Sequence, residues 1–265
     1  MKDLGIVSIV MPMYNCADFV AQSIESVQAQ TYPYWELLVV DDVSTDRSVE
    51  IVKAYAEKDS RIRLLSNPVN SGAAEARNLA LREAKGRWIA FLDSDDLWLP
   101  EKLAKQVPFM ADNDYHFSYT EYREMDDNGV HTGVKCTGPK KVGRTKLFAY
   151  DYIGCLTVMY ERDYVGLIQI PNLKKRNDYA MWLKVVKKCP CYLYPELLAE
   201  YRVRSSGSVT NRNAGIRKII KHYYIMYRES EGMGPVRAFF QTGCNLFFGA
   251  LKKLRYRKRD TTITG

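Results

Sequence analysis

The sequence lacks the motifs of several common nucleotide-binding and metal-binding classes. It has no GxxxxGK[ST] loop and no GxGxxG after its first apolar segment, which argues against a P-loop nucleotidase and a dinucleotide-binding dehydrogenase. The acidic segment DSDDLWLP, residues 93–100, lacks the central glycine and the final glutamate of a calcium loop. No uninterrupted apolar run approaches the roughly 20 residues that a membrane-spanning helix needs.

Closely spaced cysteines are also scarce. The six cysteines are dispersed apart from CPC at 189–191, which fits no zinc or redox spacing, so a reducing compartment is favoured. The first residues, MKDLGIVSIVMPMYN, hold a short apolar segment interrupted by Pro12 and no cleavage-like site. They predict a strand rather than a signal peptide. These absences predict a cytoplasmic protein.

The basic charge is concentrated near the end of the chain. The net charge is +8, and the segment 252–259 carries six basic residues, without which the net charge would be +2. A basic surface spread over the fold is therefore not expected, which argues against nucleic acid as a partner. With 265 residues and 46% hydrophobic content, the chain can form one large domain or a main domain with a smaller appendage.

Strand and helix patterns alternate over the first ninety residues. Apolar β-rich segments predict strands at 7–14, 35–42, 62–67 and 87–93, and periodic segments predict helices at 19–30, 44–59 and 71–86. Ser44 is expected to cap the second helix, and Gly86 to close the third. This alternation predicts an α/β fold, in which a parallel sheet is covered on both faces.

The pattern changes after Pro100. The predictions there are a helix at 100–110, a strand at 115–125, a hairpin turn at 126–130, a strand leading into a helix at 156–165, a helix at 176–188, a strand at 194–203 and a mobile loop at 204–215.

Acidic residues follow two of the predicted strands. Asp41 and Asp42 end one strand, while Asp93, Asp95 and Asp96 follow another. Because the carboxyl ends of parallel strands meet at one edge, these acids are expected to converge. Clustered carboxylates suit Mg²⁺ or Mn²⁺, which complete their shell with water and substrate phosphates, so a phosphorylated partner is expected. The alternative for Asp96 is to cap the helix that begins near Pro100.

Five segments resemble, in order, the motifs of the inverting family 2 glycosyltransferases. The resemblance covers about residues 6–210 and is strongest to bacterial enzymes of teichuronic acid, O-antigen and capsule synthesis. It implies a GT-A fold, with a Rossmann-like, mostly parallel sheet and flanking helices. It also implies a catalytic domain at 1–210, with a nucleotide-binding half (1–100) and an acceptor half (101–210), followed by a helical, amphipathic and basic extension at 211–265. The segments are VSIVMPMYN, ELLVVDDVSTDRS, NPVNSGAAEARNLALREAKGRWIAFLDSDDLWLPEKL, RNDYAMWLKVVKK and LAEYRVRSSGSVT.

The resemblance implies a nucleotide-sugar site in the first half. Asp42, with Asp41 beside it, would accept a hydrogen bond from uracil, and LDSDD would supply a DxD motif in which Asp95 and Asp93 hold Mn²⁺ or Mg²⁺. Asp93 could instead hold the ribose or a metal-bound water. Tyr14 would stack on the base or be a core aromatic, and Arg77 would contact the nucleotide or pair with Glu75 or a neighbouring acid. The implied nucleotide-sugar contacts are Pro12, Tyr14, Asp41, Asp42, Arg77, Asp93, Ser94, Arg202 and Arg204.

The resemblance also implies a catalytic base. Asp178, in RNDYAMW, would deprotonate the acceptor hydroxyl, and its alternative is an ordinary helix N-cap. Many relatives have Glu-Asp where this sequence has Asn177-Asp178. Trp182, one turn later, is expected in the core, and the alternative is a wall of the acceptor pocket. Arg202 or Arg204 would contact the diphosphate from a closing loop with Gly207 as its hinge.

The C-terminal segment combines an apolar stripe with basic residues, a pattern typical of a helix lying in a membrane surface. The alternatives are packing on the catalytic domain or a dimer contact. The expected stripe comprises Val236, Phe239, Phe240, Leu246, Phe247, Phe248, Leu251 and Leu254.

These features together predict a metal-dependent inverting glycosyltransferase on the inner face of a bacterial membrane. Its partners would be a nucleotide sugar, expected to be UDP-linked, a lipid-linked glycan and the membrane surface. The alternative is a non-catalytic adaptor with the same fold. A sugar-nucleotide pyrophosphorylase is disfavoured because PMYNCADFV has no glycine-rich basic loop. The transferred sugar and the oligomeric state stay open.

Overall fold

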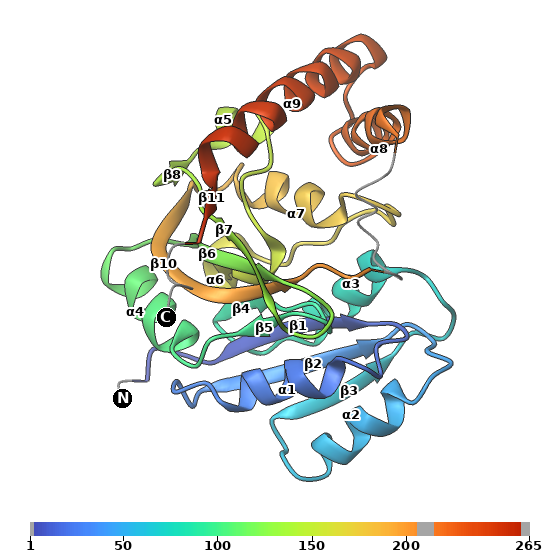
Figure 1. Ribbon diagram of the computed structural model, residues 1–265, viewed down its shortest axis with the longest axis vertical. Helices are drawn as coiled ribbons and strands as arrows, with labels where there is room; N and C mark the ends of the chain where they lie inside the picture. Colours follow the sequence, from blue (N-terminus) through green and yellow to red (C-terminus); the bar gives the residue numbers. More distant parts are fainter. Residues whose placement is uncertain (1–2, 206–214, 261–265) are drawn as a thin grey trace.

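Four parallel strands form the first half of a large sheet in the computed structural model, which describes residues 3–205 and 215–260 apart from the side chains of residues 253 and 254. β1 lies between β2 and β4, and β3 pairs with the outer side of β2. This arrangement confirms the predicted strand–helix alternation (Figure 1). The elements are β1 (Val7–Met13), α1 (Val20–Gln28), β2 (Trp35–Asp41), α2 (Ser48–Ala56), β3 (Ile62–Ser66), α3 (Ala73–Glu83) and β4 (Trp88–Phe91).

The second half continues the same sheet with antiparallel neighbours. β9 is antiparallel to both β4 and β6 and so joins the two halves, whereas β10 runs parallel to β6. The complete sheet is therefore mixed, and its parallel part is the first half. The elements are β5 (Leu97–Trp98), α4 (Lys102–Asp112), β6 (Phe117–Met125), β7 (His131–Cys136), β8 (Lys141–Val142), α5 (Arg144–Ala149), the 3₁₀ turn η1 (Cys155–Thr157), β9 (Met159–Glu161), α6 (Arg162–Val165), α7 (Asn177–Val185) and β10 (Cys191–Arg202).

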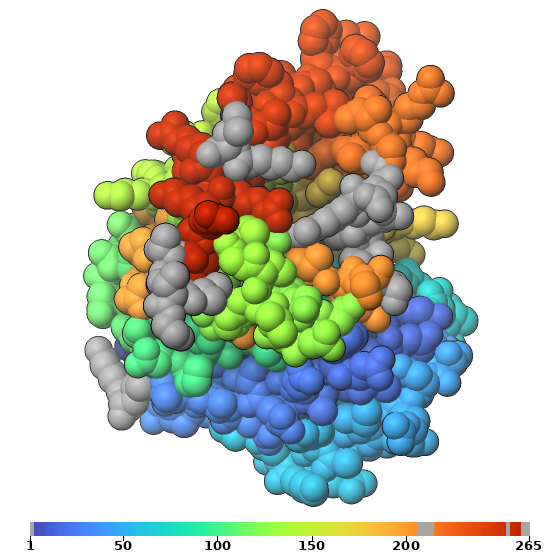
Figure 2. All heavy atoms as spheres, in the orientation of Figure 1, coloured from blue at the N-terminus to red at the C-terminus, as the bar shows by residue number. Residues whose placement is uncertain are grey.

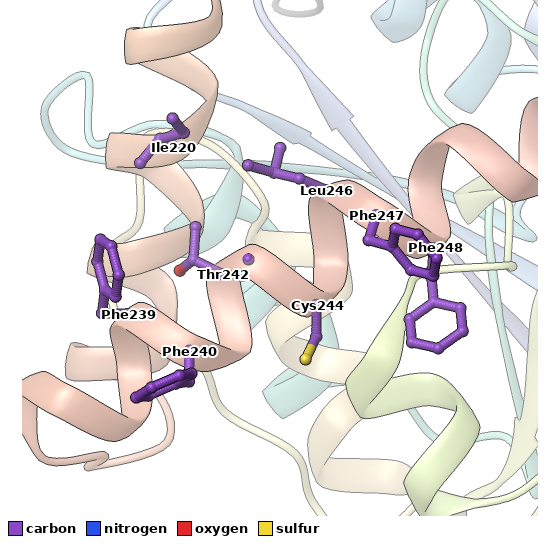
Figure 3. A pocket seen from close by; sticks show the side chains of 9 residues that line it. Ile220, Phe239, Phe240, Thr242, Cys244, Leu246, Phe247 and Phe248 are labelled. Carbon is purple, nitrogen blue, oxygen red and sulfur yellow. The ribbon is translucent and has the colours of Figure 1, made fainter.

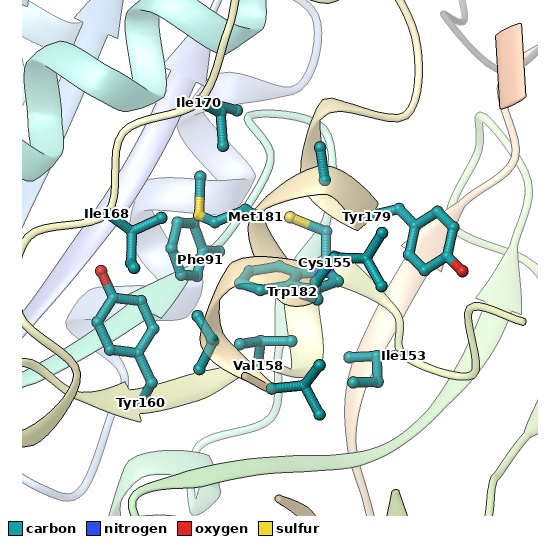
Figure 4. Packing of buried hydrophobic residues seen from close by; sticks show 14 of the residues in the cluster. Phe91, Ile153, Cys155, Val158, Tyr160, Ile168, Ile170, Tyr179, Met181 and Trp182 are labelled. Atoms are coloured by element: carbon teal, nitrogen blue, oxygen red, sulfur yellow. The ribbon is translucent and has the colours of Figure 1, made fainter. Parts of the chain in front are cut away.

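The hydrophobic core comprises two clusters of buried residues. One is built around β2, α1 and α4, and the other includes α3 and α7. Trp182 of α7 is fully buried and meets Phe91 of β4 edge to face, with ring centroids 4.9 Å apart (Figure 4). Its position in the core confirms the prediction and fixes α7 against the end of β4.

Two predicted helix boundaries are wrong. α2 begins at Ser48 and has no side-chain cap, because Ser44 lies in a turn whose backbone N–H groups bond to Asp41 and Asn15 side chains nearby. α3 ends at Glu83, so Gly86 lies beyond the helix. A Cβ at Gly86 would stand 2.5 Å from the carbonyl oxygen of Ile6, which explains the glycine by close backbone approach.

Two helices and a short strand complete the fold: α8 (Ile216–Glu229), α9 (Pro235–Tyr256) and β11 (Arg257–Arg259). α8 and α9 lie at the end of the molecule opposite α2 (Figures 1 and 2). The extension is thus helical as predicted up to Tyr256, but it ends in a strand that pairs with β7. Within the described ranges, none of the helices combines the length and apolarity required to span a membrane.

Candidate active site

The predicted acidic residues gather at the carboxyl edge of the parallel strands. Asp41 ends β2 opposite Met13, the last residue of β1. The backbone N–H of Leu92, just after β4, donates to Val10 of β1 over 3.1 Å. Because β1 lies between β2 and β4, Asp41, Asp42 and Asp93 all follow strands that end on the same side. This is the edge at which open α/β sheets bind ligands.

Asp42 organises the loop that precedes α3. Its carboxylate accepts bonds from Asn67 Nδ2 (2.7 Å) and from the backbone N–H groups of Ser71 (2.9 Å) and Gly72 (2.7 Å). Asn70 Nδ2 donates to the Asp42 carbonyl over 2.9 Å. Asp42 therefore shapes the wall of the site, and its contact to uracil stays a prediction.

Tyr14 follows β1 at the same edge and is 50% exposed. The alternative of an ordinary core aromatic is therefore wrong, and the ring is free to receive a planar ligand. Pro12, by contrast, is a buried residue of β1 whose register partner is Val40. Asp41 is buried and accepts bonds from the backbone N–H of Ser44 at 3.2 and 3.3 Å.

Arg77 of α3 connects the acidic segment to α7. One end of its guanidinium pairs with Asp93 Oδ1 at 2.5 Å, and the other donates to Asn177 Oδ1 at 2.7 Å. Burial alone would lower the pKa of Arg77, but the negative charge of Asp93 and that of Asp178 keep it above its ordinary value. Arg77 therefore forms an ion pair with an acid, which was the alternative expected from the sequence. The acid is Asp93 rather than Glu75.

Asp95 lies beside a cationic side chain from the end of β10. Its Oδ2 is 3.5 Å from Arg204 Nη1, and 24% of its side chain is exposed. Burial, followed by the charge of Asp93, raises the pKa of Asp95 to about 6. The preceding Ser94 is buried, and its carbonyl accepts bonds from Cys16 Sγ and Ser23 Oγ. Asp95 is therefore held on a fixed segment beside the positive charge of Arg204.

Asp96 and Arg202 join that segment to β10. Asp96 Oδ1 accepts a 2.8 Å bond from the backbone N–H of Arg202, so the prediction that Asp96 caps the next helix is wrong; α4 has no side-chain cap. The buried Arg202 guanidinium donates to the carbonyls of Asp95, Asp126 and Asp127 and to Gln22 Oε1. These bonds give Arg202 a structural role, whereas Arg204 is the arginine that faces an acid of the site. The predicted hinge Gly207 lies outside the described residues.

The donor chemistry of the DxD segment fits a hard divalent cation. No cluster of three or more His, Cys, Asp or Glu side chains suited to a metal exists within residues 3–205 and 215–260. Mg²⁺ and Mn²⁺ sites of the nucleotide type need only one or two carboxylates, because substrate phosphates supply the rest. Asp95 and Asp93 meet that requirement, and the buried Asp96 Oδ2 has no hydrogen-bond partner in the described structure. Burial and the charge of Asp93 raise the pKa of Asp95 in spite of Arg204, so a cation bound there would favour its ionised form.

Asp178 is the second residue of α7. The N-cap is Arg176, which adopts a left-handed conformation with φ of 63°, so the N-cap alternative for Asp178 is wrong. Asp178 Oδ1 accepts a 2.8 Å bond from the backbone N–H of Tyr179. The charges of Asp93 and Asp178 both act on Arg77 and on the buried thiol of Cys155. Arg77, which bonds to both Asp93 and Asn177, therefore links the DxD segment to the residue that precedes Asp178.

Asp151 and Lys252 belong to this region and were missed from the sequence. Burial, followed by the charge of Asp178, raises the pKa of Asp151 to about 7. Lys252 of α9 donates to the Asp151 carbonyl over 3.0 Å. A single acid between tyrosines, as in YDY, gives no signal of such a role, and Lys252 is hidden among other basic residues.

Comparison with known proteins agrees with this geometry. Residues 8–159 match the family model described as "Glycosyl transferase family 2". The chain is 39% identical over 234 residues to Bacillus subtilis (strain 168) TuaG, named as a teichuronic acid biosynthesis glycosyltransferase, covering 88% of this chain and 91% of that protein. It is 44% identical over 182 residues to Escherichia coli WfgD, a "UDP-Glc:alpha-D-GlcNAc-diphosphoundecaprenol beta-1,3-glucosyltransferase", covering 69% and 70%.

Two solved structures share the fold. Staphylococcus aureus TarS 1–349 in complex with UDP-GlcNAc superposes with a TM-score of 0.69 at 19% identity, covering 88% of this chain and 69% of that one. The Pyrobaculum calidifontis mannosyltransferase PcManGT, in complex with GDP-Man and Mn²⁺, gives 0.63 at 19% identity, covering 92% and 75%. At these identities the likeness supports the GT-A fold alone.

Proposed function

We propose, from the premise that the chain belongs to glycosyl transferase family 2, that this glycosyltransferase transfers a sugar from a UDP-linked donor to a lipid-linked glycan in bacterial surface-polysaccharide synthesis. The observation that supports the proposal best is the Asp93–Arg77–Asn177 bridge, because one buried guanidinium binds both an acid of the DxD segment and the residue that precedes Asp178. The named relative that uses UDP-glucose and a diphosphoundecaprenol-linked acceptor supports the donor and acceptor classes.

The first half would bind the donor. Tyr14 offers an exposed ring for the base, while the loop held by Asp42 forms a wall beside it. Arg204 reaches toward Asp95 from the end of β10 and would contact the diphosphate. Mn²⁺ or Mg²⁺, bound through Asp95 and Asp93, would offset the negative charge that develops on the leaving diphosphate. We assign residues 1–100 to this half, 101–210 to the acceptor half and 211–265 to the extension.

The reaction would be a single displacement. Asp178 accepts the proton of the acceptor hydroxyl as its oxygen bonds to the anomeric carbon, and the bond from that carbon to the phosphate oxygen breaks. The nucleoside diphosphate leaves with the bonding electrons. Because attack and departure occur on opposite faces of the sugar, the anomeric configuration is inverted, so an α-linked donor gives a β-linked product.

The exposed side of α9 would lie on the membrane that holds the acceptor. Phe239, Phe240 and Phe247 are 67%, 69% and 64% exposed, and Val236 and Leu251 extend the same apolar surface. The opposite side of α9 is bound to the protein, since Asn245 donates to the hydroxyl groups of Tyr179 and Tyr227. Leu254, also predicted for the stripe, lies outside the described side chains.

Part of the basic segment is engaged within the protein. Lys252 binds the Asp151 carbonyl, and Arg257 pairs with Glu124 at 2.8 Å. The segment 252–259 is therefore not a free polybasic tail as the sequence suggested. Apolar burial by the phenylalanines would then be the main contribution to membrane binding. The expected location is peripheral, on the cytoplasmic face.

The decisive experiment is a calorimetric titration with UDP, with and without Mn²⁺. We expect Mn²⁺ to strengthen UDP binding and Asp95→Ala to weaken it by about tenfold or more, which corresponds to about 1.4 kcal/mol. Asp163→Ala, which removes an exposed acid from the start of α6, is the matched control and should bind as the wild type does. A protein that binds no UDP in the presence of metal would contradict the UDP-sugar assignment. Failure with other nucleotides as well would favour the adaptor alternative.

A further inference from the structure

An apolar groove lies along α9 beside Ile220 of α8, away from the donor site. Its volume is about 500 Å³, within the range of about 300 to 1,000 Å³ that is usual for small-molecule sites. Figure 3 shows side chains from both helices around it. The lining residues include Ile220, Phe239, Phe240, Gly243, Leu246 and Phe247.

The groove offers a ligand almost no polar contact. Thr242, its hydroxyl-bearing member, already donates from Oγ1 to the Ala238 carbonyl over 2.8 Å. Gly243 borders open space, because a Cβ at this position would meet no atom within 4 Å. Such a lining selects a hydrocarbon rather than a sugar or a nucleotide.

A cationic cluster is formed by residues of α8 and of the segment that precedes α7. Burial and then the positive charges of Lys175, Arg176, Lys221 and Lys218 lower the pKa of His222 in α8. Arg176 precedes α7 and stands over the Tyr223 ring of α8, 4.5 Å from its centroid. No ion pair joins Lys218 or Lys221 to a carboxylate among the described residues. The cluster therefore has charge available for an anion.

The apolar groove and the cationic cluster together fit a single ligand that has a hydrocarbon chain next to an anionic group. Ile220 lines the groove, the neighbouring Lys221 belongs to the cluster, and Arg176 stands two residues before Asp178. We propose that the groove binds the proximal part of the hydrocarbon chain of the lipid-linked acceptor, and that the cluster binds the phosphate groups between chain and sugar. This inference rests on the proposed function, and it adds the site that would direct the acceptor hydroxyl to Asp178.

Cys244 gives a direct test, because it lines the groove and is the one exposed cysteine of the six, all of which lie in described segments. The rate of maleimide labelling would be measured with farnesyl diphosphate, inorganic pyrophosphate or phosphatidylglycerol vesicles. We expect farnesyl diphosphate to slow labelling by about tenfold at saturation, and pyrophosphate to leave it unchanged. Unchanged labelling with farnesyl diphosphate would overturn the proposal. Protection by vesicles alone would also overturn it, since the face would then serve only as a membrane surface.

Two variants test the cluster and the groove separately. Lys218→Gln/Lys221→Gln should weaken farnesyl diphosphate binding by about tenfold, roughly 1.4 kcal/mol, whereas Lys53→Gln on the remote α2 should not. Gly243→Trp should fill the groove and weaken the same binding, with Ala54→Trp on α2 as its matched control. Equal binding by Gly243→Trp and the wild type would overturn the proposal. A parallel UDP titration distinguishes this inference from the proposed function. If the protein binds UDP but not farnesyl diphosphate, only this inference is refuted. If the protein does not bind UDP, the proposed function is refuted.

Discussion

The guanidinium of Arg77 donates a 2.7 Å hydrogen bond to the side-chain oxygen of Asn177, which lies 100 residues further along the chain. The same group pairs with Asp93 at 2.5 Å. Arg77 is 5% exposed and Asn177 8% exposed, so these contacts are shielded from solvent. The start of α7, and with it Asp178, is thereby positioned by a residue of α3.

Replacing Asn177 by alanine should weaken this connection. The buried Arg77 would lose an acceptor, which costs about 1–3 kcal/mol in the free energy of unfolding. We expect kcat to fall by about tenfold as well, since misplacement of a catalytic group is costly. Asn177→Asp keeps an acceptor and should restore both quantities in part, whereas Asn113→Ala, at the exposed end of α4, should change neither. Urea unfolding measures the free energy of unfolding, and initial rates give kcat. If Asn177→Ala matched the wild type in both quantities, the prediction would be wrong.

Asp178→Asn should abolish proton acceptance while preserving shape. General-base catalysis contributes about 10²–10⁴ in rate, so kcat should fall by that factor. UDP affinity should stay within about twofold, because Asp178 is not among the proposed donor contacts. Steady-state rates and UDP titration measure the two effects. Asp163→Asn is the control. If Asp178→Asn kept the wild-type kcat, Asp178 would not be the general base.

Arg202 and Arg204 should respond differently to the same substitution. Arg202→Gln breaks several buried bonds to carbonyl oxygens, so we expect a loss of about 2–4 kcal/mol in the free energy of unfolding. The contacts of Arg204 are longer, at 3.5 Å to Asp95 and 5.0 Å to the centroid of the Phe19 ring. Arg204→Gln should therefore change stability by less than about 0.5 kcal/mol. Its expected effect is a KM for the donor raised by about tenfold. Equal destabilisation by both variants would contradict this division of roles.

Local patterns in the sequence were sufficient to predict the parallel half of the fold. β1 to β4 and the helices between them follow apolar runs and 3.6-residue periodicity, which depend on neighbours in the chain. The extension was predicted less well. The strand β11 forms because residues 257–259 pair with β7, more than a hundred residues away, and no local pattern encodes that pairing.

The candidate site shows the same limit. The DxD acids and Asp178 could be named from motifs, but the motifs do not indicate which groups neutralise or hold them. Asp96 illustrates this, since its expected cap was a local interaction whereas its observed partner is the backbone of Arg202, 106 residues away. Asp151 comes close to Asp178 of α7 and Lys252 of α9 only when the chain folds. Its raised pKa could therefore not be predicted from the sequence.

The raised pKa of Asp151 predicts a pH-dependent stability. Its pKa moves from 3.8 to about 7, chiefly through burial and then through the charge of Asp178. Between about pH 4 and 7 the unfolded chain ionises this carboxyl while the folded protein retains the proton, so the free energy of unfolding falls as pH rises. Asp151→Asn removes this dependence, and the stability of the variant relative to the wild type should increase by about 1–2 kcal/mol from pH 4.5 to 7.5, after allowance for partial exposure. Urea unfolding across this range measures the difference, with Asp163→Asn as the control. A variant that follows the wild-type pH dependence would show that Asp151 ionises normally in the folded protein.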